Sequence, residues 1–116
     1  MIKLYACILI LISSSIVSAE SVQPVSDSEH EKNCRDIMRV ANTLMKARQN
    51  GMSLDKMLEV NDRAYLDTQD SNMRQISQMI IRDAYDQPNY KTESYKQDQL
   101  NEFSSKYYLG CMKMYE

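Results

Sequence analysis

Two cysteines, Cys34 and Cys111, bracket nearly all of the chain that carries a regular apolar pattern. In an exported protein an even number of cysteines indicates a disulfide, and two cysteines permit only one pairing. The bridge would close a loop of nearly eighty residues, which stabilises a domain by about 4 kcal/mol in the chain-entropy model. The fold must therefore bring its first and last elements together.

The N-terminal sequence predicts a signal peptide. Export would place the chain in an oxidising compartment, where a disulfide is expected to form. Lys3 precedes an apolar run over residues 4–17, and Val17-Ser18-Ala19 has the small-residue form of a cleavage site. A run of about 14 residues is shorter than the roughly 20 that a spanning helix needs, so cleavage after Ala19 is favoured over a retained anchor. Cys7 lies in the segment that would be removed. We expect a periplasmic or secreted protein.

The rest of the chain divides into an arm and a domain. Residues 20–27 carry Ser, Gln and Pro24 with few apolar side chains, which predicts a flexible N-terminal arm. Residues 28–116 form the predicted disulfide-stapled helical domain. The formal charge of the exported part is about −3, by the counting that gives −2 for the whole chain. Nucleic-acid binding depends on clustered Lys and Arg, so this partner is disfavoured.

The clearest helical pattern covers residues 29–50. Ser28 and Glu31 have the spacing of a capping box at its start, and Gly51 can adopt the left-handed conformation that ends a helix. Apolar residues recur on one face of this helix: Cys34, Ile37, Met38, Ala41, Leu44 and Met45. The pattern predicts that this face enters the core.

Three further helices are expected. Ser53 caps a second, shorter helix, but residues 60–68 have no firm period and are expected to form a loop or a frayed end. A third helix begins at Asp70 or Ser71 and ends before Pro88, with Met73, Ile76, Met79, Ile80 and Ala84 on one side. A last helix begins after Thr92. Its apolar residues recur at intervals of three and four residues: Leu100, Phe103, Tyr107, Cys111 and Met114.

These patterns predict an all-α fold, a compact bundle of about four helices. The disulfide joins the start of the first helix to the end of the last, so the two helices should run roughly antiparallel. Gly110, beside Cys111, would let their backbones approach closely.

No constellation of residues indicates catalysis, a metal or a cofactor. The single histidine, His30, follows Glu29 at the edge of the arm and is expected to be exposed to solvent. The chain has no His-Glu-x-x-His, no Cys-x-x-Cys and no acidic calcium loop. Sulfur ligands in Cys111-Met112-Lys113-Met114 could bind copper(I), but the helical spacing favours a disulfide with Met114 in the core. We expect a protein that is not an enzyme and has no cofactor.

The segment from Ala84 to Lys91 is the candidate partner-binding surface, because two tyrosines flank a rigid polar turn. The candidate residues are Tyr85, Gln87, Asn89 and Tyr90. Tyrosine provides a large contact area at low entropy cost and is favoured at recognition surfaces. The alternative is that the two rings only cover the edge of the core, and the sequence leaves both interpretations open.

Most of the exported part resembles a group of small exported proteins of gamma-proteobacteria, their prophages and phages. The residues that carry this resemblance are Cys34, the run 45–51, Ala84-Tyr85, Pro88, Tyr90, Phe103, Tyr108 and Cys111. The architecture is also similar to the Spackle-type periplasmic lysozyme inhibitors of phages, which combine a signal peptide, a helical domain, one disulfide and a tyrosine-containing segment before the second cysteine. In this chain that segment is residues 107–111.

The resemblance implies a protein that binds a protein partner and inhibits it. The partner would be a phage lysozyme or another cell-wall-active effector, and the outcome superinfection exclusion or immunity. The alternative is a periplasmic stress chaperone similar to the small helical acid chaperones, which loosen when carboxylates with shifted pKa values are protonated. A wall-active enzyme is a third class, for which the sequence offers no catalytic signature.

Overall fold

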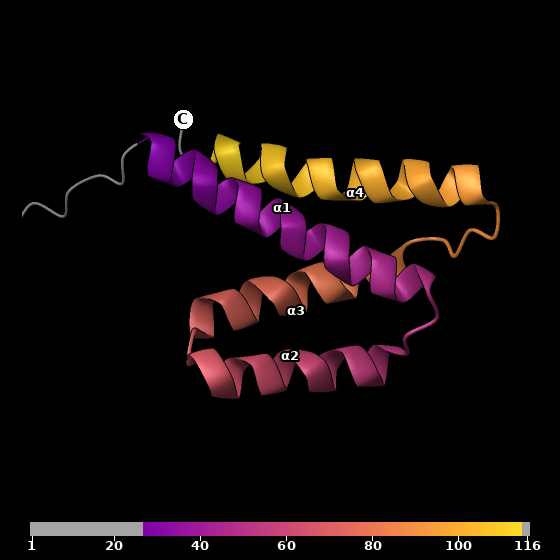
Figure 1. The fold of residues 1–116 in the computed structure, drawn as a ribbon, viewed down its shortest axis with the longest axis horizontal. Helices are drawn as coiled ribbons and strands as arrows, with labels where there is room; N and C mark the ends of the chain where they lie inside the picture. Colours follow the sequence, from indigo (N-terminus) through magenta and orange to yellow (C-terminus); the bar gives the residue numbers. More distant parts are fainter. Residues whose placement is uncertain (1–26, 115–116) are drawn as a thin grey trace, which may run out of the picture.

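The computed structural model describes residues 27–114, which form four α-helices and contain no strand. The helices are α1 (Asp27–Gln49), α2 (Leu54–Thr68), α3 (Ser71–Asp86) and α4 (Glu93–Lys113). Each helix runs antiparallel to the next, and α4 returns along α1 in the opposite direction (Figure 1). The predicted all-α bundle of about four helices is confirmed.

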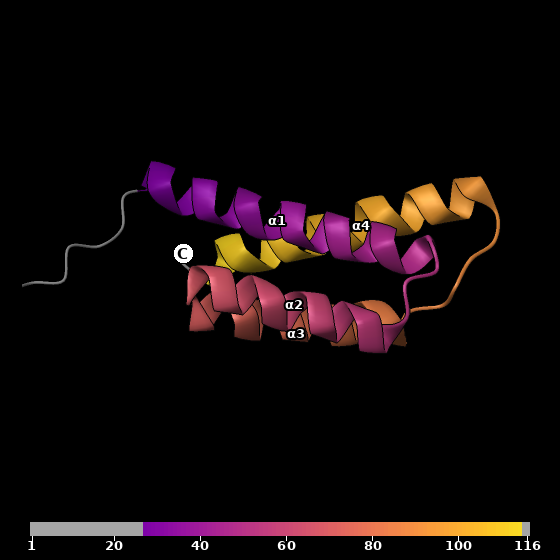
Figure 2. The ribbon, with the colours of Figure 1, turned by 60° about the horizontal axis from the view of Figure 1, so that its bottom comes forward.

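The helices form two antiparallel pairs. α1 packs along α4, α2 packs along α3, and α3 joins the pairs by packing against α1 (Figures 1 and 2). The core lies where α1, α3 and α4 meet and consists of Ala41, Met45, Ile80, Ala84, Leu100 and Phe103. Burying a large apolar side chain contributes about 1.5–3 kcal/mol, so this junction dominates the stability of the bundle. α2 supplies one buried residue, Met57, and lies at the edge.

Local signals explain where the helices begin. The Ser53 hydroxyl accepts a hydrogen bond from the Lys56 N–H at 3.2 Å, and the Asp70 carboxylate accepts one from the Met73 N–H at 3.0 Å. Both bonds satisfy a backbone donor that has no partner within its helix. Gly51 follows α1 with φ of 93°, the left-handed conformation expected after a helix end. The expected caps at these positions are confirmed.

Two expected boundaries are wrong. α1 begins at Asp27, so Ser28 lies inside its first turn and is not its cap. Residues 60–68 are helical to Thr68, although a loop or frayed end was expected. Contacts with α3 hold this part of α2, because the Asn61 side-chain amide donates to the Arg74 carbonyl at 3.3 Å. Gln69 then adopts a left-handed φ of 56°, which allows α3 to begin two residues later.

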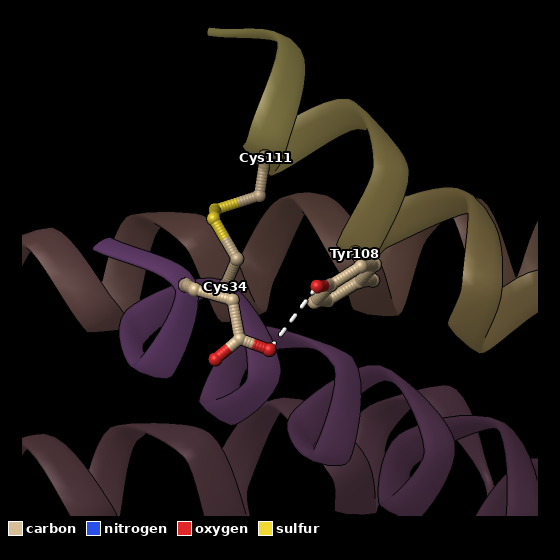
Figure 3. The surroundings of a disulfide bond; sticks show 4 residues. Cys34, Tyr108 and Cys111 are labelled. Atoms are coloured by element: carbon tan, nitrogen blue, oxygen red, sulfur yellow. Dashed lines mark hydrogen bonds between the residues drawn. A yellow bond between two sulfur atoms is a disulfide. The ribbon is translucent and has the colours of Figure 1, made fainter. Parts of the chain in front are cut away.

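The expected disulfide is present between Cys34 of α1 and Cys111 of α4, with their Cα atoms 5.4 Å apart. Tyr108, one turn before Cys111, donates a hydrogen bond from its hydroxyl to the Glu31 carboxylate at 3.2 Å (Figure 3). The bridge ties the start of α1 to the end of α4, as the sequence predicted. Gly110 is not the reason for the close approach, since a Cβ atom built on it would meet nothing within 4 Å.

Two expectations about exposure are also wrong. His30 is buried at 6% exposure, because α1 starts early enough to place it one helical turn before Cys34, on the same face. Met114, expected in the core, is 81% exposed. It follows Lys113, the last residue of α4.

The predicted signal peptide and residues 20–26 of the predicted arm lie outside the described residues. Within residues 27–114, no helix combines the length and the apolar content needed to cross a membrane.

Candidate protein-binding groove

The connection between α3 and α4, residues 87–92, is anchored by Arg48 of α1. The guanidinium donates to the Ala84 carbonyl at 3.0 Å through Nε and to the Gln87 carbonyl at 3.2 Å through Nη2. These two carbonyls lie at the end of α3, where the helix leaves acceptors without intrahelical donors. Arg48 therefore fixes the direction in which the chain leaves α3.

A second anchor comes from α4. The buried Gln99 side chain donates from Nε2 to the Pro88 carbonyl at 2.7 Å and accepts from the Gln49 amide at 3.0 Å. Gln49 also donates to the Lys96 carbonyl at 2.8 Å. The start of the connection, at Gln87 and Pro88, is thus held from both α1 and α4.

A groove of about 410 Å³ lies beside this connection, along the first half of α4. Buried Gln99 and Phe103 line its inner part. The more accessible lining comes from Gln87, Tyr90, Tyr95, Asp98, Glu102 and Lys106. The groove therefore combines aromatic rings with charged side chains on a fixed frame.

The aromatic part of the groove is a tyrosine pair. The ring centroids of Tyr90 and Tyr95 are 5.8 Å apart, with the planes tilted by 43°. Tilted aromatic pairs at this separation attract each other by about 0.5–1.5 kcal/mol beyond the area they bury. The two residues remain 40% and 61% exposed, so much of their surface is available for contact.

Asp83 of α3 contacts two residues of the groove lining, Gln87 and Lys106. Its carboxylate forms an ion pair with Lys106 at 2.5 Å and accepts hydrogen bonds from the Tyr107 hydroxyl at 2.6 Å and the Gln87 amide at 3.2 Å. Partial burial raises the pKa of Asp83, but these hydrogen bonds and the Lys106 charge outweigh it and leave the pKa below its usual value. Burial and the bond to Asp83 raise the pKa of Tyr107.

The structure separates the residues that the sequence grouped as one surface. Gln87 and Tyr90 line the groove, and Asn89 is exposed beside it. Tyr85 instead donates from its hydroxyl to the Met52 carbonyl, and the Arg48 guanidinium lies 4.9 Å from its ring centroid. Burial raises the pKa of the Tyr85 hydroxyl. Tyr85 and Tyr90 therefore do not lie on one contact surface.

Sequence reasoning missed four groove residues: Tyr95, Asp98, Glu102 and Lys106. They recur at intervals of three and four residues, which places them on one face of α4. This face is polar apart from Tyr95, so a search for apolar periodicity passes over it. The sequence signal that could have identified this face is Tyr95, a second tyrosine five residues after Tyr90.

A second groove, of about 460 Å³, lies beside the disulfide and is mostly apolar. Ile37, Ile76, Met79, Tyr107, Cys111 and Met114 contribute to its lining. Met79, expected on the inner side of its helix, is 50% exposed at this groove.

The described part of the chain contains no group of three or more His, Cys, Asp or Glu side chains placed to hold a metal ion. A disulfide is consistent with an oxidising compartment. No protein-family model, curated protein or solved structure matches the chain.

Proposed function

We propose that this protein is a non-enzymatic exported binding protein that inhibits or neutralises a protein partner through the groove beside residues 87–92. The observation that carries the proposal is the exposed pair Tyr90 and Tyr95, because Tyr90 belongs to a connection whose start, at Gln87 and Pro88, is held by α1 and α4. Tyrosine is enriched where proteins contact one another.

The fixed frame supports binding for an energetic reason. Association costs free energy whenever loops or side chains must become ordered at the interface. In this groove Arg48 and Gln99 already hold the first two residues of the connection, and the tyrosine rings already contact each other. A partner would therefore lose less free energy to ordering this surface than to ordering a loose loop.

The location and the partner class are part of the proposal. The disulfide favours an oxidising compartment, and the predicted signal peptide specifies the periplasm or the exterior. The resemblance to small exported phage and prophage proteins favours a phage lysozyme or another cell-wall-active effector as the partner. The role would then be superinfection exclusion or immunity.

An inhibition assay tests the proposal. The purified, disulfide-bonded protein is added to phage lysozymes and secreted cell-wall effectors, and the clearing of a peptidoglycan suspension is followed. We expect wild type to slow at least one enzyme and a Tyr90→Ala, Tyr95→Ala variant to lose this effect. A Leu66→Ala, Leu109→Ala variant, altered at exposed positions outside the groove, should inhibit like wild type. Inhibition by no enzyme, or equal inhibition by both variants, would contradict the proposal.

A stress chaperone is the second candidate, and one observation favours it. Lys106 and Tyr107, two of the three side chains that bond to the Asp83 carboxylate, also line the apolar groove beside the disulfide. Protonation of Asp83 in acid would weaken their hold and expose more apolar surface. Aggregation assays with unrelated client proteins at neutral and acidic pH separate the candidates, because an inhibitor specific for one partner should protect none of them.

A further inference from the structure

We infer that the groove accepts an arginine side chain of the partner, with Asp98 and Glu102 as its ion-pair partners and Tyr90 and Tyr95 as its aromatic contacts. The inference rests on the proposed function, since it names the chemistry by which that groove recognises a protein.

The two carboxylates are adjacent and uncompensated. Asp98 and Glu102 are four residues apart on α4, so they lie one helical turn apart on the same face, and both are exposed at the groove. Over residues 27–114 neither carboxylate forms an ion pair or a side-chain hydrogen bond. Glu59 of α2 differs, because it pairs with both Lys56 and Arg63.

The one cation that lines the groove does not neutralise this pair. Lys106 is four residues after Glu102, but its ammonium group pairs with Asp83 at 2.5 Å. The groove therefore presents two negative charges to a partner, and the complementary group is a cation. Electrostatic complementarity of this kind sets specificity and accelerates encounter.

The aromatic rings favour a guanidinium over an ammonium. A planar guanidinium stacks on aromatic faces while its N–H groups bind carboxylates, whereas a lysine ammonium acts as a compact, strongly hydrated charge. Tyr90 and Tyr95 lie in the same groove as Asp98 and Glu102, so one side chain can contact both kinds of group.

The molecule already contains one site of this kind, occupied by its own arginine. The Arg74 guanidinium lies 5.0 Å from the ring centroid of Tyr65 and binds the Asp62 carboxylate at 3.0 Å. Arg74 of α3 thereby connects to α2 through one tyrosine and one acid. The groove on α4 has the same two kinds of group and no arginine of this chain among its lining residues.

The test uses small probes and NMR of the isotope-labelled, disulfide-bonded protein. N-acetyl-arginine amide is titrated in low salt, next to N-acetyl-citrulline amide, which has nearly the same shape without the charge. We expect the arginine probe to shift the resonances of Tyr90, Tyr95 and the first half of α4, and the citrulline probe to leave them in place. Added salt should weaken the effect.

Two matched double variants test whether Asp98 and Glu102 bind the arginine probe. Asp98→Asn with Glu102→Gln should weaken binding of the arginine probe about threefold or more, as expected for the loss of two exposed ion pairs. Asp55→Asn with Glu59→Gln removes two acids at the same spacing on α2 and should leave binding unchanged. The Asp98→Asn, Glu102→Gln variant should keep the melting temperature of wild type, because both acids are exposed and neither forms an ion pair within residues 27–114. The α2 variant should melt slightly lower, because it removes the ion pairs of Glu59 with Lys56 and Arg63.

Three outcomes would overturn the inference. These are equal shifts with citrulline, unchanged arginine binding in the Asp98→Asn, Glu102→Gln variant, and stronger shifts of the groove by a tetramer of N-acetylglucosamine, which would indicate a sugar site. The proposed function has a separate readout. If Tyr90 and Tyr95 are needed for enzyme inhibition but Asp98 and Glu102 are not, the proposed function stands and the arginine inference fails. If the arginine probe binds but no enzyme is inhibited, the groove accepts arginine and the proposed function fails.

Discussion

Lys106 of α4 binds Asp83 of α3 with an Nζ–Oδ2 distance of 2.5 Å. This ion pair links two helices that are joined in sequence only by residues 87–92. Asp83 also accepts a hydrogen bond from Gln87 in that connection, so one carboxylate couples the α3–α4 packing to the edge of the groove.

Replacing Asp83 with Asn should destabilise the fold. The change removes the charge that holds Lys106 and weakens the bond from the Tyr107 hydroxyl. Hydrogen bonds to charged groups contribute about 1.5–3 kcal/mol, but the ion pair is partly exposed and an amide keeps some bonding. We expect the free energy of unfolding to fall by about 1–2 kcal/mol in urea titrations. An unchanged urea midpoint would show that this carboxylate does not hold α4 to α3.

Asp83 should make the fold less stable in acid than at neutral pH. Its pKa is lower in the folded chain than in the unfolded chain, so ionised Asp83 stabilises the fold above its unfolded pKa of about 3.9. This contribution is lost as pH falls from about 4 through the folded pKa. Unfolding free energies measured between pH 7 and pH 2.5 should therefore fall less steeply in Asp83→Asn than in wild type. Asp55→Asn, on exposed α2 surface, should follow the wild-type curve.

Removing the disulfide should lower the melting temperature strongly. Cys111→Ser opens a loop of 77 residues, and loss of a native bridge in a small exported domain costs about 2–5 kcal/mol. For a domain of this size the melting temperature should fall by roughly 10–20 °C. Reduction of wild type should produce a similar fall in circular dichroism melts. A melting curve unmoved by reduction would contradict the stabilising role of the bridge.

Replacing Gln99 with Ala should loosen the groove while keeping the bundle. The Pro88 carbonyl loses its donor, and the Gln49 amide loses one of its acceptors. A polar group left without its partner costs about 1–3 kcal/mol, which would appear mainly as greater motion of residues 87–92. Contacts between the Tyr90 and Tyr95 rings should weaken in NMR spectra, with helical content retained. Gln97→Ala, on the exposed side of α4, serves as the control and should leave these contacts intact.

The fold was largely predictable because local signals specify the helices and the one long-range bond, the disulfide, has only one possible pairing. Helical spacing in four segments, the caps at Ser53 and Asp70, and the forced pairing of Cys34 with Cys111 are all readable in the sequence. The helical structure of residues 60–68 was not predictable, because it depends on contacts with Arg74 of α3. The burial of His30 depends on a helix that starts at Asp27.

The candidate site was only partly predictable. The sequence identified the turn that contains Gln87 and Tyr90, but it also assigned Tyr85 to the same surface. The direction of the Tyr85 side chain depends on Arg48 and Met52, more than thirty residues away in the chain. Asp98 and Glu102 of α4 could not be assigned to the site from the sequence, because charged residues at helical spacing are usual on any solvent-facing helix. Only the structure places Tyr90 in the same groove.

The most direct test of the central claim is photo-crosslinking from the groove in living cells. A benzophenone amino acid is placed at position 95, which lines the groove and is exposed, or at position 66, on exposed α2 surface. We expect irradiation to join position 95 to one defined periplasmic or incoming phage protein, whose activity the purified protein then inhibits. Position 66 should give no such product. Equal products from both positions, or none from position 95, would contradict the account.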